Sequence, residues 1–182
     1  MGVIKVFKGI NGYKDSESIY TVLGYACNSE FCDDKIYIGN LEAREGSVLD
    51  LAKEFEAVRV PTNYPEKSVK LHHFALSVAE DGMSEAAIYD LMRNVMVYFR
   101  NMKFQVVVVK HYGSREKNNN PHLHVIVNHC NLNGRLFYGS DSDYYRLKEY
   151  LIRVTHKNWK YIYASECDYG LYNKATNLSC II

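Results

Sequence analysis

The sequence predicts an α+β fold in which a central, mostly antiparallel sheet of about five strands is flanked by helices. Segments rich in β-branched residues alternate with segments of helical periodicity, in the order β-α-β-α-β-α-β-β-β-α. The last strands are joined by loops too short for helical crossovers, which favours antiparallel pairing. A chain of 182 residues can bury a substantial core, and we expect residues 1–182 to form a single domain.

The first half of the chain is expected to contain two strands and two helices. A strand is predicted at residues 3–7, a short strand or extended arm at residues 35–38, and helices at residues 16–27 and 48–59. Asp15 or Ser16 can cap the first helix and Ser47 the second, because these side chains accept a hydrogen bond from a free backbone N–H. The first helix carries one apolar stripe at helical spacing, formed by Ile19, Val22, Leu23 and Ala26.

The second half is expected to supply the centre of the sheet. Strands are predicted at residues 69–78, 104–111, 122–128 and 135–138, the last of them after a turn at residues 131–134. A long helix is expected from Ser84 to about residue 101, and Asp141 is expected to cap a helix that ends near residue 155. The tail at residues 157–182 has weak periodicity and supports no assignment.

Composition and charge exclude several kinds of protein. No apolar run approaches the roughly 18 residues of a membrane span, and the first residues lack the long apolar stretch of a signal peptide. The five cysteines are odd in number and include no CxxC pair, which is typical of free thiols in a reducing compartment. We therefore expect a cytoplasmic protein without a membrane partner. The net charge of +1 does not by itself indicate a nucleic-acid binder.

The most informative motif is His122-Leu123-His124, at the start of an apolar, β-branched run. A strand alternates faces with a period of two residues, so both imidazoles point to one face while Leu123 points to the other. Histidine is the commonest protein ligand of metals, so two neutral imidazoles on one face form half of a metal site. The same motif also occurs on solvated strand faces that bind no metal.

A third histidine favours the metal site. His111 ends the strand expected at residues 104–111, and a polar loop joins this strand to the next. If the two strands pair as neighbours, His111 lies beside His122 and His124. Three histidines leave positions open for water or substrate, as in a catalytic metal site. The chain contains no HExxH, P-loop or GxSxG motif, so zinc peptidases, nucleotide hydrolases and serine hydrolases have no support.

This histidine pattern resembles that of the HUH endonucleases, and most closely the relaxase (mobilisation protein) family, which nicks plasmid and conjugative-element DNA. In that family one strand ends in His, and the next strand reads His-hydrophobic-His and ends in Asn. The corresponding residues here are His111, His122, His124 and Asn128.

Two further segments carry the resemblance. Residues 72–85 are similar to the family's strand that ends in Ser and precedes a helix. Residues 19–30 are similar in position and pattern to the helix that carries the family's nucleophilic tyrosine. The resemblance covers roughly residues 1–155 and implies an HUH-type fold.

The resemblance implies a site- and strand-specific nickase that initiates the transfer of mobile DNA. A tyrosine would form a 5′-phosphotyrosine, and a divalent metal held by His111, His122 and His124 would bind the scissile phosphate. The family implies Mg²⁺ or Mn²⁺, although three imidazoles by themselves suit Mn²⁺, Zn²⁺ or Ni²⁺ better. The implied partners are single-stranded DNA at an origin of transfer and accessory DNA-binding and coupling proteins.

The chain departs from the family's pattern in the loop after His111. The family has an Asp two residues after this histidine, whereas here the position is Gly113 and the loop is longer than usual. Glu116 is the candidate to replace that carboxylate as a partner that orients a ligand imidazole. Asn128 is a further candidate for a supporting role.

Tyr25 is the expected nucleophile among the 16 tyrosines. At about 100° per residue it lies well off the apolar stripe of its helix, which leaves its hydroxyl free of the core. Tyr20, on the other flank of the same helix, is an alternative. Tyr145 is another, because Tyr145 and Lys148 form a Tyr-x-x-Lys on a helix after the His-x-His strand, as in rolling-circle replication initiators. A plain amphipathic helix also explains this pair.

Three other functions stay open at this point. With Tyr145 as the nucleophile, the chain would be a rolling-circle replication initiator. The low net charge and the missing Asp fit a non-catalytic relative that binds single-stranded DNA. A small hydrolase that uses a metal-bound water is the third alternative, and its activity would not depend on a tyrosine.

Overall fold

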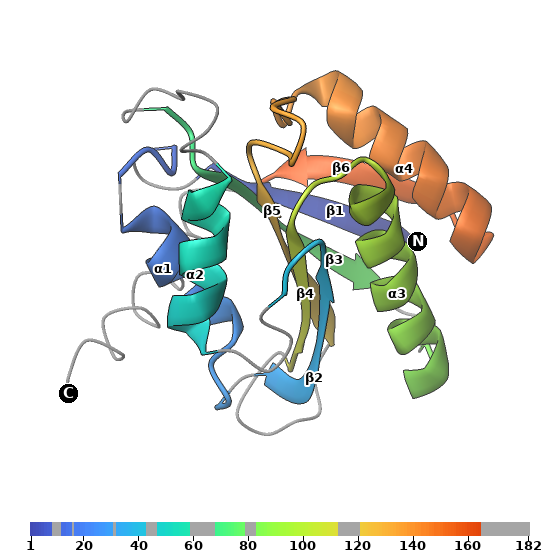
Figure 1. The fold of residues 1–182 in the computed structure, drawn as a ribbon. Helices are drawn as coiled ribbons and strands as arrows, with labels where there is room; N and C mark the ends of the chain where they lie inside the picture. The colour runs from blue at the N-terminus through green and yellow to red at the C-terminus, as the bar shows by residue number, and fades with distance from the viewer. Residues whose placement is uncertain are drawn as a thin grey trace.

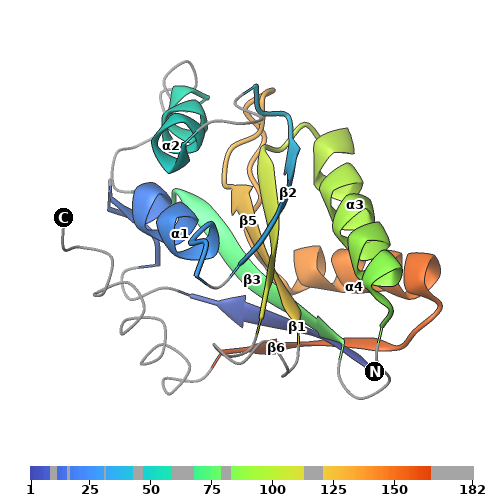
Figure 2. The same ribbon diagram turned by 90° about the horizontal axis from the view of Figure 1, so that it is seen from below.

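In the computed structural model, a six-stranded sheet lies between two pairs of helices (Figure 1). The structure describes residues 1–8, 12–15, 17–30, 32–42, 47–58, 68–78, 83–112 and 121–164. One pair of helices packs against each face of the sheet, and Figure 2 shows the two pairs on opposite sides. This three-layer arrangement confirms the expected α+β class.

The described residues form six strands and four helices. The strands are β1 (Gly2–Phe7), β2 (Cys32–Gly39), β3 (Leu71–Val78), β4 (Val106–His111), β5 (His122–Asn128) and β6 (Trp159–Tyr163). The helices are α1 (Ser18–Ala26), α2 (Val48–Ala57), α3 (Glu85–Asn101) and α4 (Asp141–Thr155). The strand order is β2-β4-β5-β3-β1-β6, and every neighbouring pair is antiparallel except β1 and β6.

One hydrophobic core lies between the sheet and helices α3 and α4. The apolar residues of each helix recur at intervals of three and four, so a single stripe faces the strands. These buried residues are Ile88, Leu91, Met92, Val95 and Phe99 in α3, and Tyr144, Leu147 and Leu151 in α4. No helix in the described part of the chain is both long enough and apolar enough to cross a membrane.

A second core lies between the opposite face of the sheet and helices α1 and α2. The apolar stripe expected in α1 is confirmed, because all four of its residues are buried. From α2, the side chains of Leu51, Ala52 and Phe55 are buried in the same core. The sheet contributes Leu71, Val107, Val109 and Ile126.

The register of β4 and β5 decides which face of the sheet carries the histidines. The two strands are antiparallel, with His111 opposite His122 and Val109 opposite His124. Val109 belongs to the core under α1 and α2, so the three imidazoles lie on that face as well. Leu123 points the other way, into the core under α3 and α4. The expected pairing of these two strands is therefore confirmed.

Strand β6 was not predicted from the sequence, and it brings the number of strands to six. It pairs in parallel with β1 at the edge of the sheet. Its first residue, Trp159, is buried over Gly2, where any Cβ would clash with the indole ring. Lys160, Ile162 and Tyr163 are exposed, so the segment lacks a strong apolar pattern.

The strand expected at residues 135–138 is absent, and an isolated bridge between Cys130 and Leu136 stands in its place. The side chain of Asn131 explains the difference. Its Oδ1 accepts hydrogen bonds from the backbone N–H groups of Asn133 and Arg135. These bonds hold the backbone in a turn and satisfy N–H groups that a strand would direct at a neighbour.

The starts of three helices follow from capping side chains. Ser140, and not the expected Asp141, caps α4, because its side chain accepts a hydrogen bond from Asp143 N and the Asp143 carboxylate accepts one from Ser140 N. Ser47 and Ser84 cap α2 and α3 as expected. The predicted cap of α4 was therefore wrong by one residue, and both Ser and Asp are favoured at this position.

Helix α1 begins without a side-chain cap. Its first helical residue is Ser18, and Glu17 occupies the capping position without a side-chain hydrogen bond. Asp15 instead accepts a hydrogen bond from the Ser18 hydroxyl at 2.5 Å, so it does not cap the backbone as expected. Ser16, the other expected cap, lies outside the described residues.

A histidine pair connects β3 to the end of β5 on the side of α3 and α4. Nε2 of His72 lies 2.8 Å from Nδ1 of His129, and the rings of His72 and Phe137 are nearly perpendicular, at 87°. Burial, together with the neighbouring His129, lowers the pKa of His72 to about 3. The folded protein therefore keeps His72 neutral well below pH 6.

Acid should destabilise the folded protein in part through His72. Below about pH 6.5 the unfolded chain binds a proton at this imidazole, whereas the folded chain, with a pKa near 3, does not. The free energy of unfolding should therefore fall as the pH drops from about 6.5 towards 3, by up to about 1.4 kcal/mol per pH unit for this group.

Urea denaturation at about pH 7 and about pH 5 measures this effect. Between these two pH values, His72→Phe should lose about 2 kcal/mol less stability than the wild type, because it lacks the group that titrates on unfolding. The same loss in both proteins would show that His72 does not contribute to the acid sensitivity.

Candidate metal and nucleophile site

Three imidazoles gather where β4 ends and β5 begins, on the sheet face that packs against α1 and α2. His111 is the last residue of β4, and His122 and His124 are the first and third residues of β5. One ring nitrogen from each residue lies within 4.8 Å of the other two. His111 and His124 are buried and His122 is half-buried, so solvent reaches the cluster from the side of His122.

The geometry of the cluster fits a single divalent cation. The Nε2 atoms of His122 and His124 are 3.1 Å apart. Two nitrogens that bind one cation at about 2.1 Å lie about 3.0–3.4 Å apart in octahedral or tetrahedral geometry. Nε2 of His111 donates a hydrogen bond to the carbonyl oxygen of Ala26 at 2.7 Å, which leaves the lone pair of this ring on Nδ1. Each of the three residues can therefore offer one neutral ring nitrogen as a metal ligand.

Burial keeps His111 and His124 neutral near pH 7. It lowers the pKa of His111 to about 4, even though the hydrogen bond to Ala26 opposes the shift, and it lowers the pKa of His124 well below its usual value. The neighbouring imidazoles, including His122, act in the same direction, because a positive charge on one ring disfavours a second. A neutral ring has the free lone pair that metal coordination requires.

A fourth histidine, His73 on β3, belongs to the site and was missed by the sequence analysis. Its Nε2 lies 2.7 Å from Nδ1 of His124, and its Nδ1 lies 3.4 Å from the hydroxyl of Tyr13. Phe7 stacks on its ring with the centroids 4.6 Å apart. The signal that could have found it is the period of two in β3, which puts His73 on the face of His124 once β3 is paired with β5.

Tyr25 lies beside the histidines, in the last turn of α1. Its ring centroid is 5.3 Å from that of His124 and 5.5 Å from that of His111. The end of the helix is held there because the next residue, Ala26, accepts the hydrogen bond from His111. Burial raises the pKa of Tyr25, so its hydroxyl is protonated at neutral pH.

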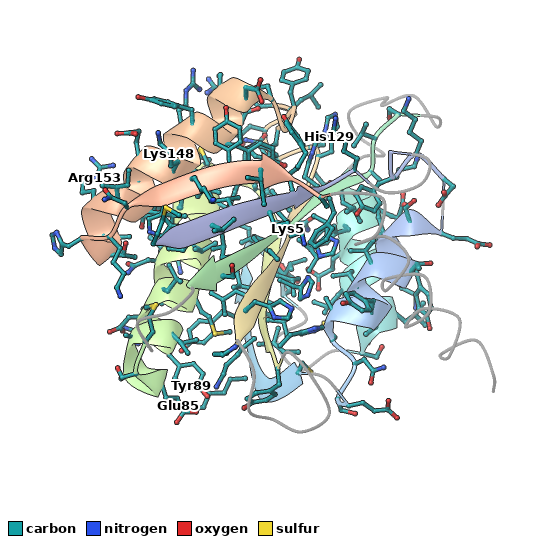
Figure 3. All side chains as sticks on the ribbon, turned by 180° about the vertical axis from the view of Figure 1, so that it is seen from behind. Lys5, Glu85, Tyr89, His129, Lys148 and Arg153 are labelled. Atoms are coloured by element: carbon teal, nitrogen blue, oxygen red, sulfur yellow. The ribbon has the colours of Figure 1, made fainter. Side chains whose placement is uncertain are left out.

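The other two candidate tyrosines lie elsewhere. Tyr20 is 54% exposed and borders a groove between α1 and α2. Tyr145 is 53% exposed on α4, which packs against the opposite face of the sheet. The Lys148 ammonium lies 4.4 Å from the centre of the Tyr145 ring, and Figure 3 shows Lys148 on the α4 side of the molecule. The structure brings Tyr25 to the imidazoles and leaves Tyr20 and Tyr145 apart from them.

Asn128 lies at the end of β5 that is remote from His122, and its side chain does not meet the imidazoles. Its amide donates to the Phe55 carbonyl oxygen at 2.8 Å and to the Gln105 side chain at 2.7 Å. Asn128 is fully buried, so these bonds tie the end of α2 to the sheet. Glu116 lies outside the described residues, and its role as an orienting partner stays a prediction.

Comparison with protein families agrees with the geometry. The family model of the MobA/VirD2-like relaxase nuclease domain matches residues 25–159, a span that contains Tyr25 and the three clustered histidines. No curated protein matches the chain. Because the family match covers well over half of the sequence, the chain belongs to the MobA/VirD2-like relaxases, a family of DNA-nicking nucleases.

Proposed function

We propose that the protein nicks one DNA strand at a specific site, rejoins it, and so initiates the mobilisation of plasmid or conjugative-element DNA. The observation that supports this proposal most strongly is the short distance between Tyr25 and the cluster, with ring centroids 5.3 Å apart for Tyr25 and His124. A tyrosine attacks phosphorus effectively only when the phosphate is held next to its hydroxyl. The imidazole cluster, loaded with a cation, is suited to hold a phosphate there.

His111, His122 and His124 would hold the cation, for which we propose Mg²⁺ or Mn²⁺. When bound, such a cation supplies the Lewis acidity that withdraws charge from the phosphate oxygens. Three neutral imidazoles leave the double charge of the cation uncompensated, which favours an anionic phosphate as the next ligand. Imidazoles suit Mn²⁺ better than Mg²⁺, so Mn²⁺ is the first cation to test.

Tyr25 would act as the nucleophile. Its Oη forms a bond to the scissile phosphorus while the bond from phosphorus to the 3′ oxygen breaks, and the leaving 3′ oxygen takes up a proton. The hydroxyl proton of Tyr25 leaves as the new bond forms, because burial raises the pKa and keeps the group protonated beforehand. The resulting 5′-phosphotyrosine conserves an ester bond, so the reverse reaction rejoins the strand without ATP.

The substrate would be single-stranded DNA at an origin of transfer. The net charge of +1 provides little general attraction to a polyanion, which favours a role for accessory DNA-binding and coupling proteins in delivering the strand. We also propose that residues 1–182 act as one nuclease domain in the cytoplasm.

Tyr25→Phe should abolish covalent attachment to DNA, because it removes only the attacking oxygen. The probe is a set of 3′-labelled single-stranded oligonucleotides that tile the DNA flanking the protein's own gene, incubated with the purified protein and Mn²⁺. A denaturing gel then detects the labelled fragment bound to protein. Wild-type protein should give this adduct with at least one oligonucleotide, and the variant should give none.

Tyr145→Phe and Tyr20→Phe are the matched controls and should retain the adduct. An adduct that persists in Tyr25→Phe and disappears in Tyr145→Phe would instead indicate a rolling-circle replication initiator. Salt-dependent binding of the oligonucleotides by the wild type, with no adduct under any divalent metal, would indicate a non-catalytic DNA-binding relative.

His122→Ala should weaken Mn²⁺ binding by more than roughly tenfold, because one of three ligands is lost at the solvent-accessible side of the cluster. Isothermal titration calorimetry on chelator-treated protein measures the dissociation constant. Adduct formation by the wild type should stop in EDTA and return with added Mn²⁺. An unchanged dissociation constant in His122→Ala would contradict the assignment of this residue as a ligand.

A further inference from the structure

We propose that His73 positions His124 for metal binding, in the place that a carboxylate or a backbone carbonyl commonly has beside a metal-binding histidine. This inference rests on the proposed metal site. A histidine ligand usually donates its second ring N–H to an acceptor, and that bond fixes the tautomer and the orientation of the ring. Here the acceptor is another imidazole.

The contact between the two rings is short and buried. Nε2 of His73 lies 2.7 Å from Nδ1 of His124, and neither ring has significant exposure to solvent. The residues belong to the neighbouring antiparallel strands β3 and β5, so both backbones are held by the sheet. The bond engages the outer nitrogen of His124 and leaves its Nε2 towards Nε2 of His122, at 3.1 Å.

Metal binding through Nε2 of His124 determines where the protons lie. The lone pair on Nε2 requires the proton of this neutral ring to be on Nδ1, and Nδ1 then donates to Nε2 of His73. His73, as an acceptor at Nε2, must carry its own proton on Nδ1, where the Tyr13 hydroxyl lies at 3.4 Å. Metal binding to His124 therefore fixes the direction of the hydrogen bonds that run from His124 to His73 and from His73 to Tyr13.

His73 is itself held in place. The Phe7 ring stacks on it with an interplanar angle of 26°. Its partner Tyr13 is held as well, because the Tyr13 backbone carbonyl accepts a hydrogen bond from Lys70 N at 2.7 Å. His73 is not a member of the group of three histidines whose ring nitrogens lie within 4.8 Å of one another. It is thus suited to orient a ligand and not to be one.

The use of an imidazole instead of a carboxylate affects the charge of the site. Among the residues that the structure describes, no carboxylate belongs to this group of three histidines. A neutral His73 orients His124 without adding negative charge, so the full positive charge of the cation acts on the phosphate. The same arrangement should make the cation bind less tightly than it would beside a carboxylate.

The chain contains a matched control for this proposal. His72 is the neighbour of His73 on β3, points to the other face of the sheet, and makes the same kind of bond to His129 at 2.8 Å. Removal of either residue breaks one bond between two imidazoles. Only the removal of His73 should alter the metal site.

The experiment is a Mn²⁺ titration of the full chain. Calorimetry and the electron paramagnetic resonance signal of free Mn²⁺ both measure the dissociation constant. His73→Phe should raise the dissociation constant by about 10–100-fold. His73→Gln should restore it to within about threefold of the wild type, because its Oε1 can accept from Nδ1 of His124. His72→Phe should leave it unchanged. Melting curves in EDTA identify variants that do not fold, and His73→Leu replaces His73→Phe in that event.

Three results would overturn the positioning role. They are equal affinities in the wild type and His73→Phe, a loss in His73→Gln as large as that in His73→Phe, and a loss in His72→Phe as large as either. A wild type that binds no Mn²⁺ would overturn both this inference and the metal site on which it rests. A wild type that binds Mn²⁺ with the expected pattern but forms no DNA adduct would support the positioning role and contradict only the proposed nicking activity.

Discussion

Every part of the site depends on the antiparallel register between β4 and β5, which sets His111 opposite His122. A slip of one residue would turn His122 and His124 towards the core under α3 and α4, where Leu123 now packs. That core has an apolar lining around Leu123, so two buried imidazoles there would lose their hydration without compensation. In this register the branched residues of the two strands are buried on both faces of the sheet.

The sheet also connects the proposed nucleophile, Tyr25, to the proposed metal ligands. The carbonyl of Ala26, one residue after Tyr25, accepts the hydrogen bond from His111, so the end of α1 is bonded directly to one ring of the histidine cluster. Because α1 packs on the sheet through its apolar stripe, the helix cannot shift along its axis without disturbing this contact. Pre-organisation of this kind lets the reacting groups meet without a large rearrangement, which is where much of the catalytic advantage of a fixed site originates.

Local periodicity predicted most of the fold and the centre of the site. A period of two put His122 and His124 on one face, and the helical stripe left Tyr25 off the core. His73 could not be found in this way, because its partner is 51 residues away and only the pairing of β3 with β5 brings the rings together. Strand β6 escaped prediction for the same reason, since β1 lies near the other end of the chain. Residues 135–138 have a strand-like pattern, but the hydrogen bonds of the Asn131 side chain hold the preceding backbone in a turn.

Because β6 pairs with β1, the sheet can be completed only after Trp159–Tyr163 have been synthesised. Strand β1 can pair with β3 as soon as β3 has been synthesised, but its other edge stays open until Trp159 reaches Gly2. Closing a loop of nearly the whole chain costs entropy and makes this pairing a slow step. Until it forms, the nascent protein exposes a row of free backbone groups along β1, which is the place where a chaperone or another nascent chain would bind.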